Sequence, residues 1–142
     1  MSISKKVIEL ILYHSGAKEE EITEESLVED DLGVTGDDAW DLMEDIHKEF
    51  NVNFDQFDFS LHFGPEAGFN VAEEYGYYPV TVKHLIEIAN RKQWILPERN
   101  EEHSHLSKAR RSKSNIIWFL IVAGIAIILF IFASPDKTVS CL

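Results

Sequence analysis

The sequence has few of the residues that would stabilise a small secreted fold or bind nucleic acid. Its 142 residues include one cysteine, Cys141, so no disulfide can form within the chain. Lysine and arginine are also scarce, 13 against 25 aspartates and glutamates, which gives a formal net charge of −12. This negative charge argues against nucleic-acid binding, which requires a basic surface for phosphate. Hydrophobic residues nevertheless make up 45% of the chain, enough for a folded core.

The charge is distributed unevenly along the chain. Residues 1–100 hold 22 acidic and 8 basic residues, a net charge of −14. Residues 101–114 have a net charge of +2, and residues 115–142 are neutral overall. The basic cluster of the middle segment consists of Lys108, Arg110, Arg111 and Lys113.

The composition predicts a four-part organisation. An acidic domain over residues 1–96 is followed by a basic, polar linker over residues 97–115. Residues 116–133 carry no charge, and a helix of these 18 residues would extend about 27 Å, close to the hydrocarbon thickness of a bilayer. We therefore expect one transmembrane helix there rather than a buried apolar helix, with a short tail over residues 134–142 on the far side.

The flanks of the apolar segment predict its orientation. Basic residues are enriched on the cytoplasmic side of membrane helices, and the basic cluster lies before the segment whereas only Lys137 follows it. We therefore expect the acidic domain in the cytoplasm, with the basic cluster contacting anionic lipid. Trp118 would be an interfacial anchor.

Three segments of the acidic domain have the periodicity of amphipathic helices: residues 4–15, 37–50 and 81–94. Thr81 is the expected N-cap of the third segment. The second segment separates its apolar and charged side chains most cleanly. Its apolar residues, which would face a core, are Ala39, Leu42, Met43, Ile46 and Phe50. The opposite side carries five carboxylates, here called the acidic face: Asp37, Asp38, Asp41, Glu44 and Asp45.

An aromatic-rich segment, residues 54–78, separates the second and third helical segments. Hydrophobic and polar residues alternate within it, with the hydrophobic positions at Phe57, Phe59, Leu61 and Phe63. This period of two predicts a short extended piece that ends at Gly64. The segment would either form a small satellite core or cover a ligand groove, and both alternatives stay open. Trp40, at the edge of the apolar side of its helix, is expected to pack against this segment.

Residues 7–50 resemble the first half of an acyl carrier protein. The matching features are the first helix, the ITEES loop, the VEDDLG motif at Val28–Gly33 and an acidic second helix that ends in KEF. The segment VTVKHLIEIA is similar to the last carrier helix, and GVTGDDAW is typical of an uncharacterised enterobacterial family of acyl-carrier-like proteins. The resemblance implies an all-α, carrier-like helical bundle with an aromatic-rich insertion. Together with the transmembrane helix, it implies a single-pass protein of the bacterial inner membrane.

The chain lacks the serine on which carrier activity depends. The resemblance places the phosphopantetheine arm 14 positions before Phe50, and this position is Gly36. Glycine offers no hydroxyl for attachment, and the hydroxyl of Thr35 is displaced by one residue. We therefore expect no bound cofactor.

The sequence contains no recognisable catalytic constellation or metal site. The paired carboxylates of the acidic face have no nucleophile or base at a suitable spacing. His103 and His105 form an HxH pair, but they lie in the predicted linker, where we expect polar linker residues rather than metal ligands. We therefore predict a protein that is not an enzyme.

Two functions are compatible with the sequence. In carrier proteins the corresponding face docks on basic patches of partner enzymes, so the resemblance implies that the acidic face binds a basic cytoplasmic partner. The first hypothesis is a non-enzymatic, membrane-tethered interaction domain. The alternative is a genuine acyl carrier that is modified at an unconventional residue and acts near the membrane. For the acidic face itself, the alternative is an ordinary solvated helix surface.

Overall fold

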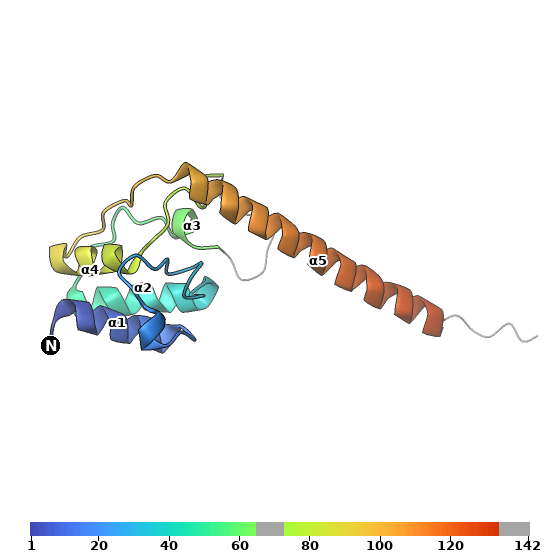
Figure 1. Ribbon diagram of the computed structural model, residues 1–142, viewed down its shortest axis with the longest axis horizontal. Coiled ribbons are helices and arrows are strands. Elements are labelled where there is room, and N and C mark those ends of the chain that lie inside the picture. The colour runs from blue at the N-terminus through green and yellow to red at the C-terminus, as the bar shows by residue number, and fades with distance from the viewer. Residues whose placement is uncertain (65–72, 134–142) are drawn as a thin grey trace, which may run out of the picture. The chain divides into compact units, whose positions relative to one another are not determined.

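A computed structural model describes residues 1–64 and 73–133, without the side chains of 105–115, 118 and 130–133 (Figure 1). The described residues are mostly helical, and the β-type pairing among them consists of two isolated bridges. Two compact units, Met1–His105 and Leu106–Leu142, are distinguished by their internal contacts. The six helices of the described residues are α1 (Ile3–His14), the short 3-10 helix η1 (Glu19–Glu21), α2 (Gly36–Phe50), α3 (Phe59–His62), α4 (Val82–Arg91) and α5 (Glu101–Ala133).

The helices of the first unit begin and end at residues with a clear local reason. The Ser2 side chain accepts a hydrogen bond from the Lys5 N–H at 3.2 Å and caps α1. Thr81 Oγ1 accepts from the His84 N–H at 3.1 Å, which confirms the predicted cap of α4. α2 ends at Asn51, whose left-handed φ of 56° stops the helix.

The core of the first unit lies between α1, α2 and α4, which pack against one another (Figure 1). The predicted apolar side of α2 is buried, except that Phe50 is only partly covered. Burying one such side chain fully contributes about 1.5–3 kcal/mol, so this contact determines the rotation of α2 about its axis. The buried helical residues are Val7 and Ile11 of α1, Ala39, Leu42, Met43 and Ile46 of α2, and Val82, Leu85, Ile88 and Ala89 of α4.

The loop between α1 and α2 is fastened to the residues around the start of α4. The Val28 N–H donates to the Val80 carbonyl at 2.9 Å, and the Val82 N–H donates to the Ser26 carbonyl at 3.0 Å. Val28 is fully buried. The VEDDLG motif therefore begins inside the core, at Val28.

The predicted extended piece in the aromatic-rich segment is wrong. Residues Phe59–His62 form the one-turn helix α3 instead. Asp58 caps this turn, because its Oδ1 accepts from the Ser60 N–H at 3.0 Å and from the Ser60 hydroxyl at 2.6 Å. Phe63, one of the hydrophobic positions of the alternating pattern, is nevertheless buried. A strong local cap therefore outweighs a period-two pattern of only a few residues.

The predicted transmembrane helix over residues 116–133 is contradicted. In the part of the chain that the structure describes, no helix is long and apolar enough to cross a membrane. α5 has 33 residues, but it begins with polar and charged residues at Glu101. The single-pass topology and the inner-membrane location inferred from it are contradicted with it.

Several predictions concern residues or side chains outside the described part of the chain. They are the interfacial role of Trp118, the tail over residues 134–142, the lipid contacts of Lys108, Arg110, Arg111 and Lys113, and any metal contact of His105.

The first unit should fold without the rest of the chain. Every member of its hydrophobic core cluster lies between Val7 and Trp94. A fragment of residues 1–105 should therefore unfold in one cooperative transition in urea, with the near-ultraviolet circular dichroism of packed aromatic rings. A fragment of residues 1–105 that shows helical signal but no cooperative transition would contradict this account of the core.

Candidate functional site

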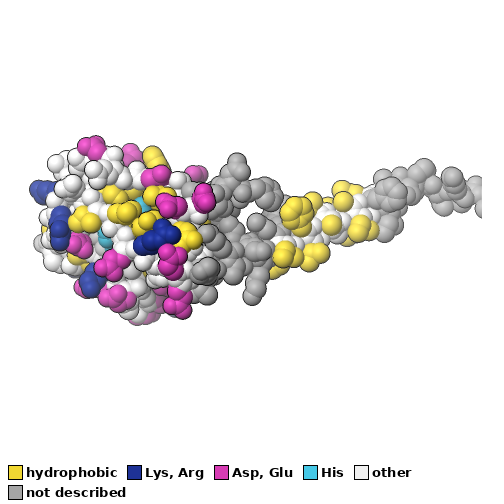
Figure 2. Space-filling model, turned by 90° about the horizontal axis from the view of Figure 1, so that it is seen from above, with side chains coloured by type: hydrophobic (Ala, Val, Ile, Leu, Met, Phe, Trp, Pro, Cys, Tyr) yellow, Lys and Arg dark blue, Asp and Glu magenta, His cyan; other side chains and the backbone are white. Residues whose placement is uncertain are grey.

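The acidic face of α2 points away from the core. Four of its five carboxylates, those of Asp37, Asp38, Asp41 and Glu44, are exposed, and Asp45 is half-buried. Acidic side chains outnumber basic ones on the face of the first unit that Figure 2 shows. The predicted segregation of α2 into an apolar and a charged side is therefore confirmed, whereas a binding role for the charged side stays a prediction.

Two of the five carboxylates are already engaged within the domain. Asp45 Oδ2 lies 2.8 Å from His14 Nε2 of α1. Glu44 Oε1 lies 2.9 Å from Lys48 Nζ, one turn further along α2. The Lys48 ammonium group neutralises part of the charge on the C-terminal half of the helix, and Asp45 is engaged by His14.

The remaining three carboxylates lie in the N-terminal half of α2. The side-chain carboxylates of Asp37, Asp38 and Asp41 make no hydrogen bond or ion pair with the residues that the structure describes. Negative charge is favourable at this end of a helix because of the helix dipole. The available charge of the acidic face is thus concentrated in the first turns of α2.

Gly36 is the first residue of α2, with Thr35 as its N-cap. Its φ is 53°, in the left-handed region that favours glycine. Its N–H donates to the carbonyl of Gly64 at 3.3 Å, so a buried residue of the aromatic-rich segment closes this helix end. The position to which the resemblance assigns the attachment serine therefore lacks a hydroxyl and has a backbone conformation that serine rarely adopts.

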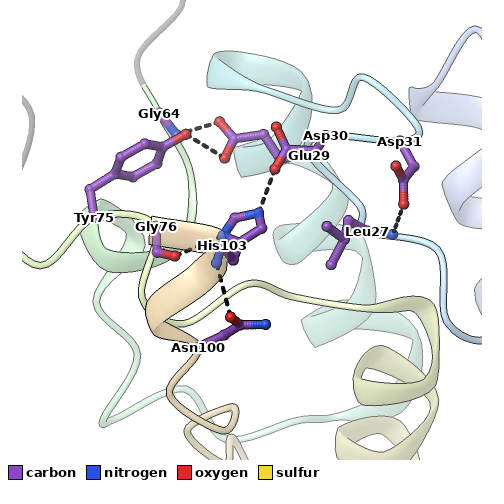
Figure 3. Close-up of polar contacts among 9 residues, drawn as sticks. All are labelled: Leu27, Glu29, Asp30, Asp31, Gly64, Tyr75, Gly76, Asn100 and His103. Atoms are coloured by element: carbon purple, nitrogen blue, oxygen red, sulfur yellow. Dashed lines mark hydrogen bonds and ion pairs between the residues drawn. The ribbon is translucent and has the colours of Figure 1, made fainter. Parts of the chain in front are cut away.

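Glu29 of the VEDDLG motif holds Gly64 in this place (Figure 3). Glu29 Oε1 accepts from the Gly64 N–H at 2.7 Å, and Glu29 Oε2 accepts from the Tyr75 hydroxyl at 2.6 Å. Hydrogen bonds to an ionised carboxylate are among the stronger ones in proteins. One side chain from the loop before α2 thereby fixes two points of the aromatic-rich segment.

The neighbouring Asp30 binds the start of α5 through His103 (Figure 3). His103 Nε2 lies 2.5 Å from Asp30 Oδ2, and His103 Nδ1 lies 2.7 Å from the Gly76 carbonyl oxygen. A backbone carbonyl and an ionised carboxylate both accept, so the two contacts favour the protonated imidazole, which has an N–H on each ring nitrogen. The hydrogen bond to Asp30 accordingly raises the pKa of His103, against burial, which lowers it; Gly76 and the charge of Glu29 add to the rise.

The role of His103 was missed by the sequence analysis, which placed it in a linker. It lies in the first turn of α5, where the Asn100 side chain accepts from its N–H at 2.9 Å. The spacing of Asn100 and His103 matches a helix N-cap, which is the one signal that could have predicted an ordered turn here. Nothing in the sequence indicates that Asp30 lies opposite.

The aromatic-rich segment packs around Trp94 in its described part. The Trp94 ring centroid lies 4.6 Å from that of Phe57 and 4.9 Å from that of His62. Burial lowers the pKa of His62 and of His84, which also contacts Trp94. Trp94 belongs to the same hydrophobic core as the buried residues of α1, α2 and α4, and Phe57 packs against this core, so the described part of the segment extends the main core and forms no separate one. The ligand-groove alternative stays a prediction. The predicted contact of Trp40 with the segment is confirmed at Phe59, with ring centroids 5.5 Å apart.

No group of three or more histidine, cysteine, aspartate or glutamate side chains within the described residues is arranged to hold a metal ion.

Comparison with known proteins identifies the family. Residues 1–96 match a family described as "Protein of unknown function (DUF1493)". The chain belongs to this family. No curated protein and no solved structure matches it. The match to the DUF1493 domain includes the acidic face, Glu29 and Asp30, and it ends before α5, so His103 lies outside the matched residues.

Placing a side chain at Gly36 should destabilise the DUF1493 domain. The left-handed φ of 53° implies that Gly36→Ser costs about 1–2 kcal/mol, because Cβ crowds the following carbonyl in this conformation. Urea unfolding measures this loss. Gly16→Ser is the matched control, since no atom lies within 4 Å of its added Cβ and its φ is not left-handed. Equal stability of the two variants would contradict the left-handed conformation of Gly36.

The stability of the domain should fall as the pH rises through the pKa of His103. That pKa is raised in the folded state by Asp30, so the stabilisation is complete below about pH 6.5, the ordinary histidine value, and is lost above the raised pKa. Unfolding curves between pH 6 and pH 9 measure this loss for the full chain.

Two variants identify the source of this pH dependence. His103→Gln and Asp30→Asn should each lower the free energy of unfolding at pH 6. In each variant this free energy should also decrease less between pH 6 and pH 9 than in the unchanged chain. The loss of unfolding free energy in the double variant should not exceed the sum of the losses in the two single variants, because both changes remove the same contact. An alkaline loss that persists in His103→Gln would assign it to another group.

Proposed function

We propose that this chain is a non-enzymatic interaction domain with an acyl-carrier-like helical bundle, and that it binds a basic protein partner through the acidic face of α2. The observation that carries the proposal is the free charge at the start of this helix. The side chains of Asp37, Asp38 and Asp41 are exposed and make no ion pair with described residues, although the helix that carries them is fixed by the core.

The packing of the DUF1493 domain supports the acyl-carrier-like part of the proposal. α1, α2 and α4 pack together, and the VEDDLG loop leads into the start of α2. The GVTGDDAW stretch has a local role in starting this helix. Val34 and Ala39 are buried, Thr35 is the N-cap and Gly36 has the left-handed conformation. These local roles support the interpretation that the stretch starts α2.

Electrostatics explains what such a surface does in binding. Fixed charges of one sign raise the rate at which an oppositely charged partner is encountered, and salt screens this effect beyond about 8 Å at physiological ionic strength. The carboxylates of Asp37, Asp38 and Asp41 need no partner inside the domain, so a basic partner would not have to displace an existing ion pair.

Charge reversal with a matched control tests the proposal. Asp37→Lys, Asp38→Lys and Asp41→Lys, combined in one chain, should reduce capture of basic proteins from a native extract at least tenfold, as quantified by mass spectrometry. The control combines Glu19→Lys, Glu20→Lys and Glu24→Lys, which are exposed and change the net charge equally. Capture that falls equally in both variants would show that overall charge, and not the acidic face, attracts the partner.

The alternative of a genuine carrier has one observation in its favour. The Thr35 hydroxyl lies at the start of α2 and makes no capping hydrogen bond. Intact mass after incubation with coenzyme A and a phosphopantetheinyl transferase decides between the two. The interaction-domain proposal expects an unchanged mass, whereas a gain of the arm's mass that Thr35→Val abolishes would establish the carrier.

A further inference from the structure

Trp40 is exposed on α2 although it is one of the largest apolar residues of the chain. Its exposed fraction is 56%, against 4% for Trp94. Side chains three and four positions apart are neighbours on a helix surface, so Asp37 and Glu44 flank Trp40, and Asp41 follows it directly. We call this combination of one indole and three carboxylates the Trp40 surface.

The Trp40 ring packs against an ordered row of aromatic side chains. Its contact with Phe59 is edge-on, with an interplanar angle of 62°. Phe59 in turn contacts Phe63, with centroids 5.2 Å apart, and Phe63 is 2% exposed. The indole is therefore positioned by the core before any partner arrives, and a preorganised ring binds at a lower entropy cost. Exposed tryptophan is among the residues that contribute most to binding energy at interfaces.

We propose that Trp40 is the aromatic anchor of the acidic face and that its occupant is an arginine side chain of the basic protein partner. This inference rests on the proposed function and adds the residue chemistry of the partner. A guanidinium can stack on an indole while its N–H groups donate to a neighbouring carboxylate. The ammonium group of lysine is a point charge without a planar face and cannot make both contacts in this way.

The chain itself holds an arginine in such a combination of ring and carboxylate. The Arg99 guanidinium carbon lies 3.9 Å from the centroid of the Tyr77 ring. Arg99 Nε lies 2.7 Å from Glu101 Oε1. The Trp40 surface offers the same two chemical groups, an exposed aromatic ring and carboxylates at neighbouring positions of α2.

The test compares two helical peptides of equal length and charge, one with arginine and one with lysine at every basic position. Calorimetric titration of the full chain should give a dissociation constant about two- to fivefold lower for the arginine peptide, the range of an exposed cation–π contact. Trp40→Leu should abolish this preference while both peptides still bind the carboxylates. Trp40→Phe should retain part of the preference, and circular dichroism checks that both variants are folded.

The outcomes separate this inference from the proposed function. Equal affinity for both peptides, with binding lost in the Asp37, Asp38 and Asp41 reversal, would overturn the role of Trp40 and leave the acidic face as the docking surface. Binding that survives the reversal, or no binding of either peptide, would overturn both. Self-association of the free chain that Trp40→Leu abolishes would overturn the assignment of a separate partner, because the occupant would then be a second copy.

Discussion

Burial of one side of α2 is the constraint on which the rest of the molecule depends. Leu42 and Ile46 are fully buried between α1 and α4, and they set the rotation of the helix. With this rotation fixed, Asp37 and Asp41 cannot turn inward, because burying an unpaired carboxylate costs several kcal/mol. The domain therefore presents the acidic face on a rigid helix.

The acidic residues of the domain have two different roles. Glu29 and Asp30 point into the molecule, where Glu29 holds Gly64 and Tyr75, and Asp30 holds His103. The carboxylates at the start of α2 point outward and have no such partners among the described residues. Glu29 and Asp30 thus hold the residues around the start of α2 in place. The carboxylates at the start of α2 are available to a partner.

The sequence predicted the parts of the fold that depend on local pattern. The periodicity of α2 identified its buried and charged sides, and the Thr81 cap was found from the residue type alone. Predictions failed where the local conformation depends on a distant contact or on a competing local interaction. The Asp58 cap converts an alternating stretch into α3, and His103 meets Asp30 across 73 positions. The left-handed conformation of Gly36 could not be inferred either, since glycine occurs in every backbone region.

The most direct test of the central claim is the association rate of the full chain with the arginine peptide at increasing ionic strength. The account predicts a rate that falls steeply between low and physiological salt, and a much flatter dependence when Asp37, Asp38 and Asp41 are reversed to lysine. Reversal of Glu19, Glu20 and Glu24 should leave most of the dependence in place. An identical salt dependence in both charge-reversed chains would contradict the claim that the start of α2 is the docking surface.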